Sequence, residues 1–421
     1  MTYHCADLFC GGGGTSTGMI EAFKKAGVDY TLIGINHWAV AIETNRMNHD
    51  GQYYCASIDG VDPTDVVPGG VLDILWASPE CTNHSRAKGG MPRQNQSRCQ
   101  PEMLLSWIRK LIVKRMYVEN VPDFLDWGPL LSKDTVIDGK LYKAGTPDPR
   151  KKTLFFRDWI ESIKRSGYRV DWQIMNAADY GAATCRERLI VQAVRIGTGE
   201  RIKWPEPTHA HEPGLFKERQ WIPARDIIDW SIKGQSIFNR KTPLKPNTLK
   251  RIENGIRKYW KDWAEPFLVL LRGTKPNQLD CTTHRLTEPL FIPQQSGGTV
   301  KPVSQPLPTI STAGAISIVQ PLIQAYYGSN KECKPVSQPL DTITTIGHFG
   351  LVEGQLLKMP DGQMYKLDIT FRMLQPHELA AAMSFPKDYR FSGTKTEKIK
   401  QIGNAVCPKL SESLIAAAIS A

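Results

Sequence analysis

The chain has 421 residues, too many for a single compact core, so we expect two domains. Its contents of hydrophobic residues, 41%, and of charged residues, 23%, are typical of a soluble globular protein. The 53 Lys and Arg residues outnumber the 42 Asp and Glu residues and give a net charge of +11. A basic protein of this size often binds polyanions, which makes nucleic acid a candidate partner, although a generally basic enzyme would have the same composition.

The cysteines and the apolar segments exclude several other classes of protein. The nine cysteines are odd in number and scattered, without a CxxC pair. We therefore expect reduced thiols in the cytoplasm, with no disulfide framework and no metal site. Asp7 and the glycines that follow it interrupt the short N-terminal apolar stretch, so no signal peptide is expected. No run approaches the ~20 apolar residues that a membrane span needs, and no membrane partner is expected.

Roughly the first 200 residues alternate short apolar runs with segments of helical periodicity. The expected strands are 3–9, 31–36, 71–76, 116–119, 168–174 and 189–194, and the expected helices are 19–26, 39–48, 101–112 and 154–165. Strands that alternate with helices favour a parallel sheet with helices on both faces, which is an α/β fold.

A segment at residues 126–152 interrupts this alternation. Asp138-Gly139 is a typical hairpin turn, and it separates two short apolar runs at 135–137 and 140–142. We interpret the segment as an insertion at the rim of the sheet.

The composition changes near Trp204, after which the chain is rich in Pro, Gly, Thr and Gln until about residue 365. Within this part the heptapeptide KPVSQPL at 301–307 returns at 334–340, 33 residues later, and a Thr-Ile-rich run follows each copy. Two copies are too few for a self-supporting solenoid, so we expect them to belong to a small β-rich domain at 205–365. Helical character returns near the C-terminus, and we assign residues 1–204 and 366–421 to the other domain.

Four glycines, Gly11 to Gly14, stand between the first expected strand and the first expected helix. Without Cβ atoms, such a loop lets the backbone approach a ligand closely, and loops of this kind lie at the carboxyl edge of parallel sheets, where cofactors bind. The alternative interpretation is a flexible turn.

Three further positions carry polar chemistry at the ends of strands. Cys81 has polar neighbours and is followed by a glycine-containing basic loop, a setting that suits a reactive thiolate better than a buried structural thiol. Glu119 ends the strand at 116–119, where it is either a functional acid or a surface carboxylate. Arg186 and Arg188 precede a strand at alternate positions, so they project to one face and could act together, unless they form a solvated basic turn.

In this order, these segments resemble the motifs of the DNA (cytosine-5) methyltransferases of prokaryotic or phage type. The run DLFCGGGGTS at 7–16 is similar to the family's S-adenosylmethionine loop, and ENV at 119–121 is identical to a second motif. The run PECT at 79–82 resembles the family's Pro-Pro-Cys-Gln loop, with Glu80 and Thr82 as departures. The run TCRER at 184–188 resembles QxRxR, with Thr in the Gln position.

The resemblance implies a Rossmann-like methyltransferase domain with a mostly parallel sheet and a smaller β-rich target-recognition domain, here residues 205–365. It makes Cys81 the nucleophile that attacks C6 of a flipped-out cytosine. It also implies that Glu119 holds the ring by N3 and the exocyclic amine, and that Arg186 and Arg188 contact the base carbonyl and the DNA backbone. The implied partner is double-stranded DNA, bound by a monomer.

The implied cofactor is S-adenosylmethionine. The residues that the resemblance assigns to its binding are Asp7, Phe9, Gly11, Gly13, Asn36, His37, Trp38, Ser57, Ile58, Pro79, Asn404 and Ala405. Two of them depart from the family pattern, since His37 replaces a ribose-binding acid and Ser57 replaces an Asp beside the adenine amine. Asn404 belongs to the closing motif, which returns from the far end of the chain.

Three alternatives remain open from the residues alone. The enzyme could act on a pyrimidine in RNA, such as tRNA. The departures at His37, Ser57, Glu80 and Thr184 could instead mark a catalytically impaired DNA-binding protein on the same scaffold. The repeats could also form a protein-interaction module fused to the enzyme.

Overall fold

The computed structural model describes two compact units of the chain. The described residues are 2–79, 100–214, 218–238, 240–244, 246–259, 283–285, 290–293, 301–302, 316–319, 322–325, 333–345, 349–358 and 365–420. The first unit contains Met1–Ile222, Asp341–Ile346 and Leu379–Ala421, and the second unit contains Pro223–Leu340 and Gly347–Glu378. No helix among the described residues is long and apolar enough to cross a membrane.

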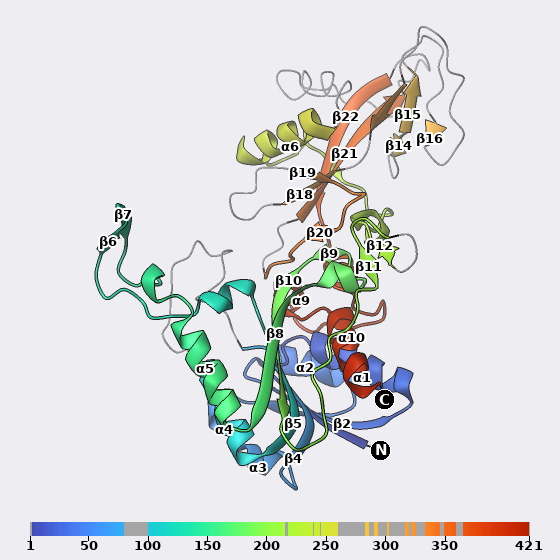
Figure 1. Cartoon of the computed structure of the whole chain (residues 1–421). Helices are drawn as coiled ribbons and strands as arrows, with labels where there is room; N and C mark the ends of the chain where they lie inside the picture. Colours follow the sequence, from blue (N-terminus) through green and yellow to red (C-terminus); the bar gives the residue numbers. More distant parts are fainter. Residues whose placement is uncertain are drawn as a thin grey trace. The chain divides into compact units, whose positions relative to one another are not determined.

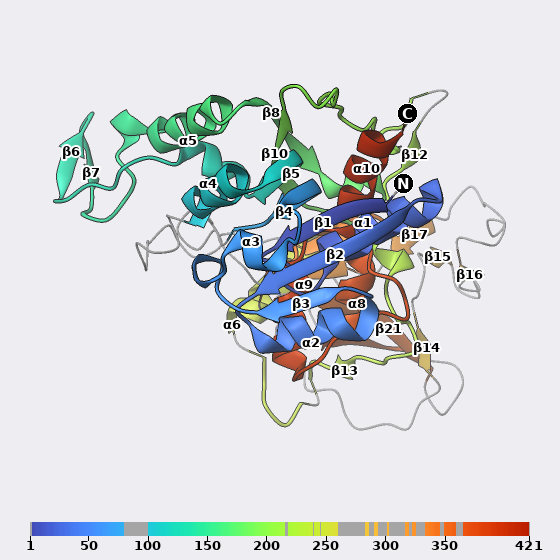
Figure 2. The same ribbon diagram turned by 90° about the horizontal axis from the view of Figure 1, so that it is seen from below.

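The first unit is built on a seven-stranded sheet in the order β3-β2-β1-β4-β5-β10-β8 (Figures 1 and 2). Its strands are β1 (Thr2–Leu8), β2 (Asp29–Asn36), β3 (Gln52–Cys55), β4 (Val71–Ala77), β5 (Ile112–Asn120), β8 (Tyr168–Asn176) and β10 (Glu187–Arg195). The first five are parallel to one another, which confirms the predicted α/β fold with a mostly parallel sheet.

The exception in this mostly parallel sheet is β10, which is antiparallel to both β5 and β8. Only a short 3₁₀ helix (Ala177–Tyr180) and the two-residue strand β9 (Thr184–Cys185) lie between β8 and β10. A parallel return needs a crossover of a dozen or more residues, which this connection does not provide. The chain therefore turns back beside β8.

Helices cover both faces of this sheet, as Figure 2 shows. On one face lie α3 (Pro63–Val66), α4 (Gln100–Lys110) and α5 (Leu154–Arg165), and on the other α1 (Gly14–Ala26) packs against α10 (Pro408–Ile419). The remaining helices of this part of the chain are α2 (Ala39–Asn48), α8 (Pro376–Ala382) and α9 (Lys395–Asn404).

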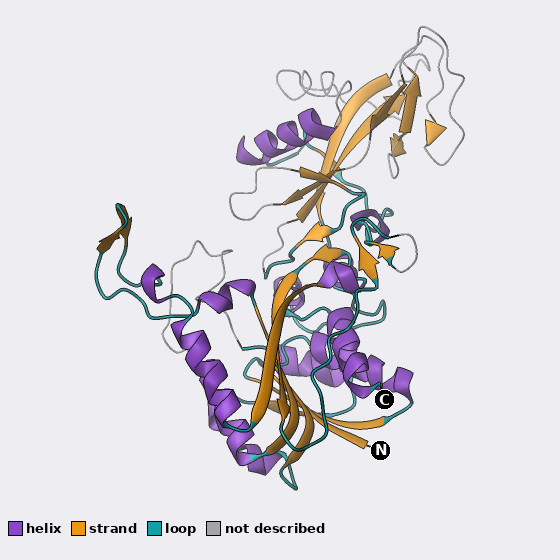
Figure 3. Ribbon diagram, in the orientation of Figure 1, coloured by secondary structure: helices purple, strands orange, loops and turns teal. Residues whose placement is uncertain are grey.

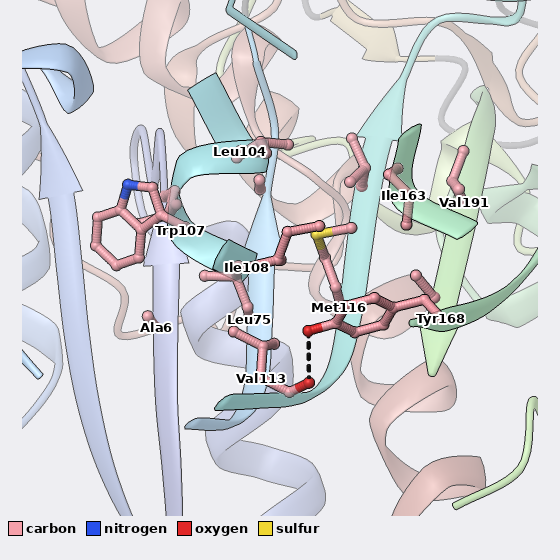
Figure 4. Close-up of a cluster of buried hydrophobic side chains, with 14 of the residues drawn as sticks. Ala6, Leu75, Leu104, Trp107, Ile108, Val113, Met116, Ile163, Tyr168 and Val191 are labelled. Atoms are coloured by element: carbon pink, nitrogen blue, oxygen red, sulfur yellow. Dashed lines mark hydrogen bonds between the residues drawn. The ribbon is translucent and has the colours of Figure 1, made fainter. Parts of the chain in front are cut away.

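The core lies between the sheet and helices α4 and α5 (Figure 4). Trp107 of α4 is fully buried there, and Met116 and Val191 fill it from β5 and β10. The Tyr168 hydroxyl donates a hydrogen bond of 2.9 Å to the Val113 carbonyl oxygen, so even the polar end of this buried ring has a partner. This packing holds the ends of the strands, and therefore the loops that follow them, in fixed positions.

The predicted hairpin in the insertion is confirmed. Strands β6 (Thr135–Ile137) and β7 (Lys140–Tyr142) pair as an antiparallel ladder beyond α5 (Figure 1). Asp138 and Gly139 both have positive φ, 49° and 74°, as a two-residue turn with the twist of a hairpin requires.

The second unit is β-rich and mainly antiparallel, which agrees with the predicted character of the smaller domain (Figure 3). Its strands are β13 (Gln235–Ser236), β14 (Thr283–Arg285), β15 (Leu290–Pro293), β16 (Lys301–Pro302), β17 (Ile316–Val319), β18 (Leu322–Ala325), β19 (Cys333–Pro335), β21 (Phe349–Lys358) and β22 (Tyr365–Met373), and its helix is α6 (Pro246–Tyr259). The second copy of the repeat begins in β19. Most of the first copy lies outside the described residues.

Candidate active site

Three of the predicted site segments follow neighbouring parallel strands. The glycine loop follows β1, Pro79 follows β4, and Glu119 and Asn120 end β5. Because these strands are parallel and in register, their carboxyl ends meet at one edge of the sheet. The Asn120 side-chain amide reaches the Pro79 carbonyl oxygen at 3.5 Å, so the ends of β4 and β5 are joined. The sheet therefore brings these predicted segments together at one edge.

The glycine loop adopts a conformation that requires glycine at several positions. Gly11 and Gly13 have φ of 50° and 81°, in the left-handed region. A Cβ atom at Gly14 would lie 2.1 Å from the Val406 carbonyl oxygen, and one at Gly13 would lie 2.4 Å from the Tyr389 hydroxyl. A Cβ atom at Gly11 would meet only the Phe9 carbonyl oxygen, at 3.8 Å. A side chain would therefore clash at Gly13 and Gly14 but not at Gly11, so the loop leaves room for a ligand at Gly11.

Asp7 lies behind this loop and is fully buried. The Ser16 hydroxyl donates a hydrogen bond of 2.7 Å to one carboxyl oxygen, and the other oxygen has no partner among the described residues. Burial raises the pKa of Asp7 to about 7, against the opposing effect of the Ser16 hydrogen bond. Asp7 supports the loop from the inside, and its contact with a cofactor stays a prediction.

The ends of β2 and β3 lie along the same edge and carry the other predicted cofactor residues. The Asn36 side-chain oxygen accepts a hydrogen bond of 2.8 Å from the backbone N–H of Trp38, whose side chain is half-buried. The Lys400 ammonium lies 4.4 Å from the centroid of the Trp38 ring, a cation–π contact. His37 is exposed.

At the end of β3, Ser57 is exposed and Ile58 is buried. The Ser57 hydroxyl donates a hydrogen bond to the Asp59 carboxylate. The acid that the family places at position 57 is therefore replaced by a serine that orients a nearby acid.

Asn404, at the end of α9, is exposed, and Ala405 beside it is buried. The guanidinium of Arg186 donates to the carbonyl oxygens on both sides of Asn404, at 3.1 Å to Gly403 and 2.9 Å to Ala405. It also donates to the Ile343 carbonyl oxygen at 2.9 Å. Arg186 thereby fixes the closing turn.

The two predicted arginines have different partners in this structure, and their joint contact with a base and the DNA backbone stays a prediction. Arg186 is 3% exposed, and burial, with a smaller effect of Arg188, lowers its pKa to about 9. Arg188 instead forms an ion pair with Glu119, with 2.8 Å between its Nε and a carboxylate oxygen. Thr184, in the position of the family's Gln, is buried and donates to the Asp341 carbonyl oxygen at 2.8 Å.

Glu119 and Arg188 form a polar pair at the edge of the sheet where the parallel strands end. Both side chains are largely buried, with 9% and 12% of their surfaces exposed. The carboxylate accepts hydrogen bonds and the guanidinium donates them, so the pair offers both functions side by side to a planar polar ring.

The predicted nucleophile, Cys81, lies outside the described residues, as do Glu80 and Thr82. Pro79 is described and lies two positions before the cysteine, beside Asn120. Over the described ranges, no three His, Cys, Asp or Glu side chains gather where they could hold a metal ion.

Sequence reasoning missed two side chains that contact the glycine loop. Asn45 of α2 donates to the Gly11 carbonyl oxygen, and the Tyr389 hydroxyl donates to that of Gly12. No motif marks either residue, because each acts only after distant segments have been brought together by folding.

The comparisons with known proteins agree with this fold and site. The family model of C-5 cytosine-specific DNA methylases matches residues 148–420. DNA (cytosine-5)-methyltransferase 2 of Arabidopsis thaliana is 24% identical over 466 residues, which cover 97% of this chain and 28% of the plant protein. The type II methyltransferase M.AgeI of Thalassovita gelatinovora is 26% identical over 241 residues, which cover 53% of this chain and 49% of that protein. This chain thus spans only about a quarter of the length of the plant relative.

A solved structure of a Spodoptera frugiperda DNMT2 mutant has a similar fold. Its TM-score is 0.54 at 13% sequence identity, and the match covers 99% of this chain and 100% of that one. At this identity the likeness concerns the fold alone.

Proposed function

The chain belongs to the C-5 cytosine-specific DNA methylase family, and from this premise we propose that it transfers a methyl group from S-adenosylmethionine to carbon 5 of cytosine in double-stranded DNA. The observation that carries the proposal is the Glu119–Arg188 pair, which stands at the same sheet edge as the glycine loop. A base held by this pair would lie next to the cofactor cradle.

The chemistry requires activation of the ring, because C5 of cytosine is a poor nucleophile. The Cys81 thiolate adds to C6, and the electron pair of the C5–C6 bond becomes available at C5. Glu119 binds the N3 side of the ring, where charge develops during this addition. S-adenosylmethionine, when bound, would supply the methyl group to C5 as an electrophile, with cleavage of its S–CH3 bond and S-adenosylhomocysteine as the leaving group. The C5 proton then leaves to a base or a water molecule, the C5–C6 double bond re-forms, and the thiolate departs.

The thiolate must approach the face of the ring, which stacking in a duplex blocks. The base must therefore leave the helix before Cys81 can react. Arg188, held by Glu119, is the described guanidinium best placed to contact the base carbonyl. We assign the second unit to recognition of the DNA sequence, with the basic side chain of Arg240 as a candidate for a phosphate or base contact.

The test supplies methyl-labelled S-adenosylmethionine with duplex DNA and, in parallel, with tRNA. We expect label in DNA, in the wild type and in a Cys5→Ala control, which removes a buried thiol in the middle of β1. The Cys81→Ala variant should give none. Label in tRNA alone would contradict the proposed substrate.

A duplex that contains 5-fluorocytosine separates an active enzyme from an impaired one. Fluorine cannot leave C5 as a proton does, so an active enzyme should remain covalently joined to the DNA through Cys81. If the wild type and Cys81→Ala both bind this duplex and neither forms an adduct, the chain is a DNA-binding protein on a methylase scaffold.

A further inference from the structure

Three successive carbonyl groups of the glycine loop are bound by side chains from the interior. The Asn45 amide donates to the Gly11 oxygen at 2.8 Å, and the Tyr389 hydroxyl donates to the Gly12 oxygen at 2.7 Å. The Thr17 hydroxyl donates to the Gly13 oxygen at 2.7 Å. The inner side of the loop is therefore fixed by hydrogen bonds, one carbonyl after another.

Two of these side chains come from other elements and are themselves held rigidly. Asn45 is fully buried on α2, and its amide also donates to the Ala41 carbonyl oxygen at 2.9 Å. Tyr389 is 377 positions from Gly12 in the chain, and its ring packs against Phe385 and Phe391 with centroids 4.7 Å and 4.9 Å away. Neither donor can move without disturbing its own packing.

The orientation of the carbonyls determines what the loop presents on its open side. In a trans peptide the N–H of the next residue points away from the carbonyl, so the inward Gly11 oxygen turns the N–H of Gly12 outward. The N–H of Gly13, opposite the inward Gly12 oxygen, instead donates to the Cys10 carbonyl oxygen at 3.0 Å and closes the turn. Among the described residues, no backbone carbonyl accepts a hydrogen bond from the N–H of Gly11 or Gly12. Successive free N–H groups form a concave site for acceptor atoms, such as the oxygens of a carboxylate.

We propose that Asn45 and Tyr389 are positioning residues for the cofactor: they hold the Gly11 and Gly12 carbonyls inward and so fix the turn whose Gly11 and Gly12 N–H groups are presented to S-adenosylmethionine. The inference rests on the proposed function for the identity of the ligand. Neither residue touches the cofactor, and both act through the backbone of the loop.

The test measures the affinity of the full chain for S-adenosylhomocysteine by calorimetry. Tyr389→Phe removes only the donor hydroxyl, and Asn45→Asp replaces the donor amide with an isosteric acceptor. Each should weaken binding by about tenfold, since a buried carbonyl loses its partner and the loop gains alternative conformations. In turnover, the KM for S-adenosylmethionine should rise and kcat at saturating cofactor should stay the same.

Tyr168→Phe is the matched control, because it also removes a buried tyrosine hydroxyl that donates to a backbone carbonyl, that of Val113, within the same unit. Its thermal stability should fall by a similar amount, with unchanged affinity for the ligand. Unchanged affinity in folded Tyr389→Phe and Asn45→Asp, or an equal loss in Tyr168→Phe, would overturn the inference.

The proposed function fails in a different way. If the wild type binds S-adenosylhomocysteine tightly and methylates neither DNA nor tRNA, the methylase activity is refuted, and the positioning role is still decided by the affinities of the variants.

Discussion

Arg188 of β10 forms an ion pair with Glu119 of β5, across two neighbouring strands that run in opposite directions. The antiparallel direction of β10 matters here, because it brings the start of that strand beside the carboxyl end of β5. A parallel strand in the same place would have put Arg188 at the other edge of the sheet. The antiparallel direction of β10 in this mostly parallel sheet is therefore part of how the site is built.

Removal of either partner of this pair should affect activity and stability differently. Glu119→Gln should lower the rate of methyl transfer about 100-fold or more, since the acid that binds N3 is lost. Arg188→Gln should cost about 3 kcal/mol of unfolding free energy, because a largely buried carboxylate is left without its partner. Methylation rates and urea denaturation measure the two effects.

The double variant Glu119→Gln/Arg188→Gln should regain part of the lost stability but none of the activity. A matched control is Lys164→Gln, which breaks an exposed pair with Glu161 and should cost less than about 1 kcal/mol. If the double variant is as unstable as the sum of the single variants, the two side chains are not coupled.

Arg186 should behave as a structural residue of the cofactor side. Arg186→Lys keeps a positive charge but cannot serve three carbonyl oxygens at once, so we expect a loss of about 3 kcal/mol in stability and weaker binding of S-adenosylhomocysteine. Affinity for duplex DNA, measured by fluorescence anisotropy, should change little. A tenfold weaker DNA affinity with normal stability and normal cofactor binding would restore the role that the family motif suggests.

Local signals predicted much of this fold. Helix α2 begins and ends at the predicted residues. The dipeptide Asp138-Gly139 predicts its turn because these two residue types tolerate the positive φ values that the turn requires. Local signals do not predict the direction of β10. That direction follows from the short connection between β8 and β10, which contains no crossover helix. The position of Cys81 was marked by its neighbours in sequence, and its structural setting lies outside the described residues.

The contacts within the site were harder to predict than its motifs. Arg186 binds carbonyl oxygens 157 to 219 positions away, and Tyr389 binds one 377 positions away. A motif shows that an arginine occurs at a strand end, but its partner depends on which distant segment packs there.

Gly14 should tolerate no side chain, for a reason that differs from backbone strain. A Cβ atom there would lie 2.1 Å from the Val406 carbonyl oxygen, so Gly14→Ala must displace the closing turn next to Asn404. We expect a loss of about 3 kcal/mol and weaker binding of S-adenosylhomocysteine.

Gly27→Ala is the matched control for that substitution. Gly27 has a positive φ of 65° and nothing within 4 Å of its Cβ position, so only strain of about 1 kcal/mol is expected, with normal ligand binding. Equal effects of the two substitutions on binding would show that contact with the closing turn is not what matters.

Asp7 and His49 should make stability depend on pH in opposite directions. Burial raises the pKa of Asp7 from 3.8 to about 7, so the folded chain keeps a proton that the unfolded chain has already lost. The resulting stabilisation is full below about pH 4 and is lost as the pH rises to 7. Burial lowers the pKa of His49 from 6.5 to about 4, so its stabilisation is full above about pH 6.5 and is lost as the pH falls toward 4.

Because the two effects overlap between pH 4 and 6.5, they partly cancel in the wild type, and single variants should separate them. Asp7→Asn resembles the neutral carboxyl, so it should match the wild type near pH 4 and be more stable by up to about 4 kcal/mol at pH 8. His49→Gln should lose the decline in melting temperature on the acid side. Melting curves from pH 4 to 8 decide the point: parallel curves for wild type and Asp7→Asn would mean that this carboxyl is ionised beneath the glycine loop at neutral pH, with a counter-charge that the described residues do not supply.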